Sequence, residues 1–169
     1  MTTRIAALTA LVALAVVPTA SAQLPQGDTE GVQKGSSAVT GVPSALEGSV
    51  EAGSRCRTVW AGRYRKNALQ IVVWRYRQEI FFCYKPNRAT GGGRITYLSR
   101  TRWGRTYLAV WTFRGHIGNA TSWNARWSYR AFSQGHFEYC PGVWLCVASR
   151  EPWVRMTVYG SGSWTWKTG

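Results

Sequence analysis

Two histidines and a nearby carboxylate are the residues of this sequence best suited to chemistry. His116 lies in the stretch RGHIGN, and His136 precedes Glu138 by two residues in SQGHFEYC. Side chains two residues apart on a strand point to the same face, so we expect His136 and Glu138 to be neighbours. Two imidazoles, a carboxylate and a nearby arginine are sufficient for acid–base cleavage of RNA. Each histidine also follows a glycine, as solvated turn histidines often do, and we favour that simpler interpretation.

Other enzyme classes find little support in the sequence. Residues 55–169 contain three acids, Glu79, Glu138 and Glu151, whereas a glycosidase needs two carboxylates placed across a sugar-binding cleft. The sequence has no G-x-S-x-G elbow of a serine hydrolase, and no phosphate-binding loop that ends in G-K-S/T. We therefore favour a protein without catalytic residues or cofactor, and keep a small ribonuclease-like hydrolase as the alternative.

The four cysteines, Cys56, Cys83, Cys140 and Cys146, indicate two disulfides rather than a metal site. Their spacing contains no C-x2-C pair and the chain has only two histidines, so zinc is disfavoured and we expect no metal. Four cysteines allow three pairings. We favour Cys140–Cys146, because the Pro141-Gly142 sequence between them can turn the chain, and Cys56–Cys83 then follows by elimination.

The charge of the chain points to an anionic partner. The formal net charge is +14, and residues 55–169 contain 19 basic residues against three acids. Such a surface attracts polyanions, for which the candidates are a cell-wall polymer, an acidic polysaccharide, an anionic lipid surface or nucleic acid. The arginines that we expect to bind this partner are Arg75, Arg77, Arg100, Arg102, Arg105, Arg126 and Arg130.

Two plainer explanations of these arginines remain open. Arginine outnumbers lysine by 17 to four, which a GC-rich genome alone would favour. Arginine also stacks on tryptophan and tyrosine rings, so some of these side chains would only cover aromatic neighbours. Neither explanation removes the excess positive charge.

The chain divides into three segments of different composition. Residues 1–22 combine a positive start, an apolar run and small residues before Gln23, which is the pattern of a secretory signal peptide. Residues 23–54 lack aromatic residues, and we expect a flexible linker or pro-segment there. Residues 55–169 hold all the tryptophan, tyrosine and phenylalanine residues and form one domain. We therefore expect a secreted protein without a transmembrane segment.

Alternation of apolar and polar residues predicts an all-β domain. In Val72–Lys85, Trp74 and Tyr76 fall on one face of a strand and Arg75 and Arg77 on the other. Further runs alternate in the same way and are separated by glycine, proline and asparagine turns, namely 94–103, 107–113, 123–131 and 154–159. This pattern is typical of an antiparallel β-sandwich or barrel of about seven to nine short strands.

Four stretches resemble small secreted β-rich proteins of actinobacteria. They are WRYRQEIFFCY, FRGHIGN, AFSQGHFEYC and PWVRMTVYGSGSWTW, and the resemblance covers most of residues 56–169. It implies an exported, β-rich protein. Because that group has no assigned activity, the resemblance gives no catalytic residue to carry over.

Overall fold

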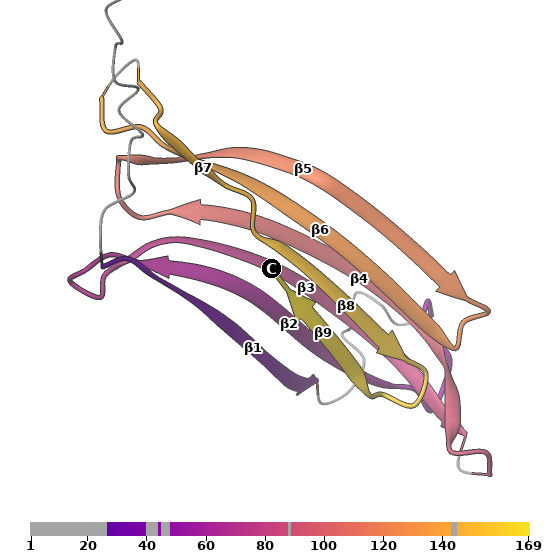
Figure 1. Cartoon of the computed structure of the whole chain (residues 1–169). Helices are drawn as coiled ribbons and strands as arrows, with labels where there is room; N and C mark the ends of the chain where they lie inside the picture. The colour runs from indigo at the N-terminus through magenta and orange to yellow at the C-terminus, as the bar shows by residue number, and fades with distance from the viewer. Residues whose placement is uncertain (1–26, 40–43, 45–47, 88, 143–144) are drawn as a thin grey trace, which may run out of the picture.

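The computed structural model describes residues 27–39, 44, 48–87, 89–142 and 145–169. Within these ranges nine strands form two antiparallel sheets without an α-helix, which confirms the all-β prediction (Figure 1). Sheet A contains, in spatial order, β1 (Thr29–Val39), β2 (Arg55–Lys66), β3 (Val72–Asn87) and β4 (Gly92–Thr106). Sheet B contains β5 (Trp111–Asn124), β6 (Ser128–Tyr139), β8 (Trp153–Tyr159) and β9 (Trp164–Thr168), with the short β7 (Ala148–Arg150) also paired to β6.

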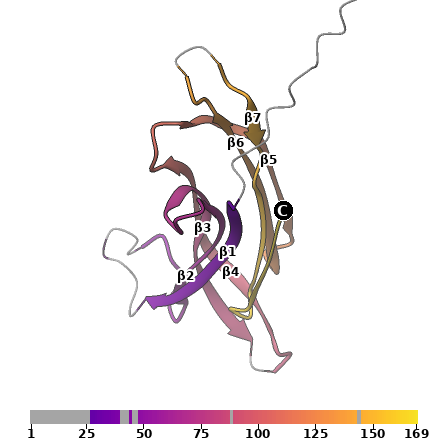
Figure 2. The same ribbon diagram turned by 60° about the vertical axis from the view of Figure 1, so that its left-hand side comes forward.

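The two sheets form two layers that do not close into a barrel (Figure 2). Aromatic side chains fill the space between the layers. Trp74 of β3 stacks on Phe137 of β6 with ring centroids 4.8 Å apart, and its ring meets Trp111 of β5 edge-on. The alternation predicted for Val72–Lys85 is confirmed, because Trp74 and Tyr76 are fully buried while Arg75 lies on the opposite, outer face.

Part of the segment 23–54, for which we expected a flexible linker or pro-segment, is the ordered strand β1. Residues 29–39 pair with β2 along their whole length. A Cβ atom on Gly31 or Gly35 would collide with the ring of Tyr64 or Trp60, respectively. The aromatic rings of β2 therefore cover the glycines of the edge strand, which supplies the apolar contact that β1 itself lacks. The proposed signal peptide, residues 1–22, lies outside the described residues.

Acidic residues at the start of β1 fix this strand to the arginines of β2. Asp28 accepts a hydrogen bond from Arg65 Nε at 2.9 Å, and these two side chains are only 4% and 6% exposed. Glu30 accepts from Arg65 Nη1 at 3.0 Å and from Arg63 Nη2 at 2.8 Å. The acids of the segment that we expected to be flexible thus neutralise part of the domain's positive charge.

Two predicted strands contain turns instead. Tyr107 to Val110 form the connection between the sheets, so that β5 begins only at Trp111. Residues 125–127 form the β5–β6 turn, where Ala125 and Arg126 have φ angles of 41° and 66°. The alternation at 123–131 wrongly predicted one continuous strand. Trp123 and Tyr129 are cross-strand partners on the two sides of the turn, so their rings lie on the same face as they would within a single strand.

The face assignment of 94–103 is also wrong beyond Ile95. The β3–β4 register shifts so that Cys83 pairs with Tyr97 while Tyr84 pairs with Ile95, which leaves Thr96 as an extra residue. A bulge of this kind reverses the side-chain alternation. Beyond it, Arg100 and Arg102 pair with the buried residues Ile80 and Gln78 and therefore face the interior instead of solvent.

Both disulfides have the predicted pairing. Cys56 and Cys83 are directly opposite each other on β2 and β3, and their bond lies on the outer face of sheet A. Cys140 and Cys146 close a short loop after β6. In the described part of the chain, no helix is long and apolar enough to cross a membrane.

An exposed ion-pair cluster on sheet A makes stability depend on pH. Glu51 accepts hydrogen bonds from Lys85 Nζ at 2.9 Å and from Arg94 Nε at 3.0 Å. The bonds to Arg94 and Lys85 lower the pKa of Glu51 from 4.5 to about 2. Because the folded-state pKa is the lower one, the stabilisation is present above pH 4.5 and is lost as the pH falls towards 2.

We expect Glu51→Gln to remove this pH dependence. The variant should unfold at lower urea concentration than the parent protein at pH 7, and the two urea midpoints should converge as the pH falls towards 2. Urea unfolding followed by tryptophan fluorescence at a series of pH values measures the difference. A difference that stays constant from pH 7 to pH 2 would contradict the proposed role of the ionised carboxylate.

Candidate anion-binding site

The structure distributes the seven predicted binding arginines over four places. Arg75, Arg77 and Arg105 lie on the outer face of sheet A. Arg100 and Arg102 face the space between the sheets, and Arg126 lies at the tip of the β5–β6 hairpin. Arg130 lies on the outer face of sheet B. They do not form one continuous patch.

On sheet A, aromatic rings and an acid reduce the availability of the arginines. Arg77 forms a salt bridge with Glu79 at 2.5 Å, and its guanidinium lies 4.1 Å from the ring centroid of Trp60. Arg75 and Arg105 are directly opposite each other on β3 and β4, and both lie over Tyr107. The plainer explanation, that arginines cover aromatic rings, therefore applies to this face.

On sheet B, three cations lie together on the outer face. Arg155 of β8 and Lys167 of β9 are direct cross-strand partners, and Arg130 of β6 is diagonal to Arg155. All three side chains are exposed. No carboxylate among the described residues forms a salt bridge with any of them. We call Arg130, Arg155 and Lys167 the sheet B patch.

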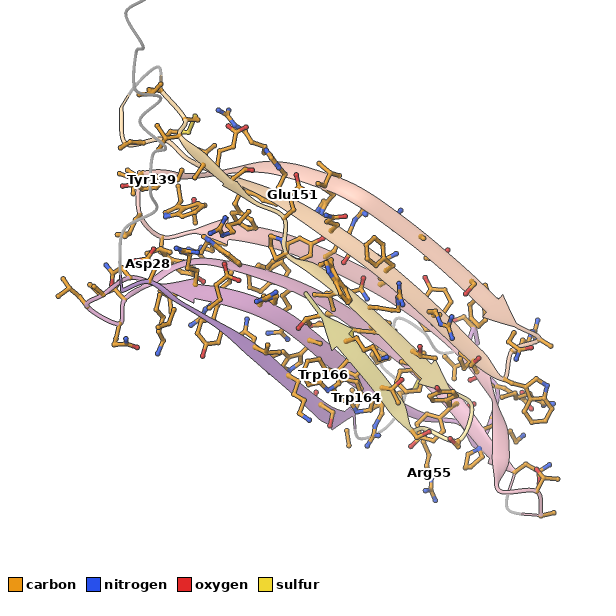
Figure 3. All side chains as sticks on the ribbon, in the orientation of Figure 1. Asp28, Arg55, Tyr139, Glu151, Trp164 and Trp166 are labelled. Carbon is orange, nitrogen blue, oxygen red and sulfur yellow. A yellow bond between two sulfur atoms is a disulfide. The ribbon has the colours of Figure 1, made fainter. Side chains whose placement is uncertain are left out.

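Two shallow grooves meet at the sheet B patch. One, of about 350 Å³, includes Arg130 and Arg155, and its other lining residues are Ala120, Thr121, Ser122 and Phe132. The other, of about 190 Å³, contains all three cations, together with Thr157, Tyr159, Thr165 and Trp166. Because Arg130 and Arg155 line both grooves, the hollowed surface extends from β5 across β6 and β8 to β9. Figure 3 shows the ribbons of these four strands side by side, with Trp164 and Trp166 on β9.

The sheet B patch has the chemistry of an anion-binding surface. Like charges directly opposite each other on neighbouring strands, such as Arg155 and Lys167, destabilise a sheet unless an anion lies between them. The guanidinium of Arg155 also lies 5.8 Å from the ring centroids of both Phe132 and Trp153. A ligand at this surface would meet cations and aromatic rings together, as single-stranded nucleic acids and anionic sugars require.

Sequence reasoning named Arg130 as a candidate binding residue but not the other two residues of the sheet B patch. The alternation of 154–158 already places Arg155 outward, and Lys167 alternates with Trp164 and Trp166 in the last strand. What the sequence lacks is the order of strands, which brings β6, β8 and β9 side by side. Arg126 belongs to another groove, of about 500 Å³, which it lines with Trp127 and Arg94.

The structure brings together two of the three candidate catalytic residues. His136 Nε2 lies 3.1 Å from Glu138 Oε1 on the outer face of sheet B, and its Nδ1 lies 3.3 Å from Glu151. Arg114 Nε donates to the second oxygen of Glu138 at 2.7 Å. Hydrogen bonds from Arg114 and then His136 lower the pKa of Glu138, so this carboxylate is ionised at neutral pH.

His116 is not part of that group. It pairs with Gly135 on the neighbouring strand, so its side chain lies on the inner face, opposite to that of His136. Its Nδ1 lies 3.1 Å from the hydroxyl of Tyr76. Cleavage that uses both imidazoles on one phosphate requires them on the same side of the sheet, and this arrangement does not provide it.

One potential group of metal ligands lacks the necessary donors. Oxygen and sulfur atoms of Glu138, Cys140 and Cys146 lie close together. The two sulfurs belong to one disulfide, and zinc requires thiolates.

Comparison with known proteins found no matching family model, no matching curated protein and no matching solved structure.

Proposed function

We propose that this protein binds an anionic polymer across the outer face of sheet B. The observation that carries the proposal is the sheet B patch, where Arg130, Arg155 and Lys167 are exposed, adjacent and without a carboxylate partner among the described residues. Two grooves that share Arg130 and Arg155 give an extended ligand room to follow the surface. Repeated negative charges along one chain would engage all three cations at once.

We also propose that the protein acts outside the cell. Two disulfides and no free cysteine are compatible with an oxidising compartment. There the available polyanions are wall polymers, acidic polysaccharides and released nucleic acid. The ribonuclease-like alternative has weaker support, because His116 and His136 lie on opposite faces of sheet B.

The binding experiment compares two triple variants with equal loss of charge. The first is Arg130→Gln, Arg155→Gln and Lys167→Gln on sheet B, and the second is Lys66→Gln, Arg75→Gln and Arg105→Gln on sheet A. The probes are a fluorescein-labelled heparin oligosaccharide and a labelled oligo(dT), with fluorescence anisotropy recorded over a range of salt concentrations.

We expect the sheet B triple to bind the probes about 10- to 100-fold more weakly than the parent protein at 0.1 M salt. The slope of log K against log salt concentration should also be smaller by about two to three. The sheet A triple should stay within about threefold of the parent protein, since none of its three cations lines either of the two sheet B grooves. Equal losses in the two triples would show that net charge, and not the sheet B patch, attracts the polymer.

A further inference from the structure

Among the described residues, Arg100 connects the two sheets through neutral partners only. Its Nη1 donates to Asn119 Oδ1 of β5 at 2.7 Å. Its Nη2 donates to Gln78 Oε1 of β3 at 2.7 Å and to the backbone carbonyl of Phe132 at 2.8 Å. None of these acceptors carries a charge, so the hydrogen bonds hold the guanidinium in place without neutralising it.

Arg102 adds a second uncompensated cation beside the first. It lies two residues further along β4, on the same inner face. Its Nη1 and the Nε of Arg100 are buried and have no hydrogen-bond partner in the described part of the protein. Neither arginine forms a salt bridge with a described carboxylate. Buried N–H groups of two cations without an anion are costly, and an anionic ligand would remove that cost.

His116 and Tyr76 complete the surroundings of these arginines. The Tyr76 hydroxyl lies 3.1 Å from His116 Nδ1, and His116 is exposed, so solvent reaches this edge between β4 and β5. When the phenol donates to Nδ1, the ring hydrogen is on Nε2, which can then donate to a ligand. Partial burial of the imidazole, and then the charges of Arg102 and Arg100, lower the pKa of His116. Burial also raises the pKa of Tyr76, so both groups are neutral at pH 7.

We propose that this cluster, Arg100, Arg102, His116 and Tyr76, binds a tetrahedral oxyanion, namely a phosphate or sulfate group. Its donors come from three strands of two sheets, β3, β4 and β5. Tyr76 and His116 are in contact, and Arg100 and Arg102 are near enough for their charges to act on both. An anion with several oxygens can accept from all of them, whereas a carboxylate is satisfied by a single guanidinium fork. This site lies on the inner face, is separate from the sheet B patch, and does not depend on the proposed polymer binding.

The two histidines of the chain provide a direct test. We would titrate the full chain with inorganic phosphate, sulfate and acetate and follow the imidazole signals by NMR, using His136→Asn to assign them. Bound phosphate or sulfate should shift the His116 signals saturably and raise the pKa of His116, because the anion stabilises the imidazolium. His136, on the opposite face beside Glu138, is the internal control and should not change.

Variants of Arg102 and Arg105, which lie on opposite faces of β4, provide a second test of the site. Arg102→Gln, which breaks no hydrogen bond seen among the described residues, should weaken phosphate binding about tenfold or more. Arg102→Lys should recover only part of the affinity, and Arg105→Gln on the outer face should bind as the parent protein does. The sheet B triple should retain the response of His116 even if it no longer binds polymer.

Three results would contradict the proposal that this cluster binds a tetrahedral oxyanion. These are an unchanged phosphate response in Arg102→Gln, parallel shifts of His116 and His136 that do not saturate, and acetate affinity equal to that of phosphate. The first would remove Arg102 from the site, the second would indicate a general ionic effect, and the third would contradict the preference for a tetrahedral ligand.

Discussion

Trp74→Ala is expected to lower the free energy of unfolding by about 3–5 kcal/mol. The ring is fully buried, stacks on Phe137 across the two sheets and contacts Trp111 at its edge. Its removal would leave a cavity at the centre of the contact between sheets A and B, where the surrounding strands can relax only partly. Urea unfolding at pH 7, followed by far-ultraviolet circular dichroism, measures the loss.

Two further variants give this prediction its controls. Trp123 is 52% exposed at the end of β5, and Trp123→Ala should cost about 1 kcal/mol or less. Trp74→Phe should cost less than Trp74→Ala, because the phenyl ring refills much of the cavity. Both variants remove the buried indole N–H, which has no partner among the described residues. If Trp74→Ala lowered the free energy of unfolding as little as Trp123→Ala does, Trp74 would not lie at the centre of the hydrophobic core.

Arg65→Met is expected to destabilise the protein by about 3–5 kcal/mol, because it leaves a buried carboxylate without its cation. Asp28 is only 4% exposed, and Arg65 Nε is its hydrogen-bond donor. The same variant also loses the contact of the guanidinium with the Trp111 ring. The expected loss would show that the first residues of β1 are held by the domain and do not move freely as a linker.

The double variant Asp28→Asn, Arg65→Met separates charge from packing. Removing both charges should restore most of the stability, since a neutral pair costs far less to bury than a single ion. Arg114→Met breaks an exposed pair with Glu138 and should cost much less than Arg65→Met. If the double variant were as unstable as Arg65→Met, the loss would come from packing and not from the unpaired carboxylate.

Period-two alternation predicted most of the strands correctly because burial on one face is a local property of the sequence. Trp74 and Phe82 are buried as expected, and Arg75 lies on the other face. The pairing of Cys140 with Cys146 was also predictable, since Pro141 and Gly142 allow a short turn. These features depend only on residues that are close together in the chain.

The errors arise where a partner strand decides the outcome. Residues 29–39 contain too few large apolar groups to predict a strand, but Trp60 and Tyr64 of β2 cover their glycines. The bulge at Thr96 turns Arg100 inward, and it is set by the register with β3 and not by any turn residue in β4. Neither contact can be read from the segment alone.

The candidate sites were predictable in composition but not in position. The excess of arginine indicated an anionic partner, and Arg130, Arg100 and Arg102 were among the residues named for it. Their division between an outer patch and an inner cluster follows from strand order and from the bulge. Lys167 joins Arg155 only because β8 and β9 are neighbours in sheet B.

The cysteines pair in chain order, the first with the second (Cys56–Cys83) and the third with the fourth (Cys140–Cys146). Either link can therefore close as soon as its own segment has been made, without a thiol that is synthesised much later and without reshuffling of a wrong bond. Both links also lie within one sheet or one loop, so no covalent bond joins the two layers. Reduction would loosen the β2–β3 pair of sheet A and the loop after β6, while the contact between the layers would still rest on its aromatic core.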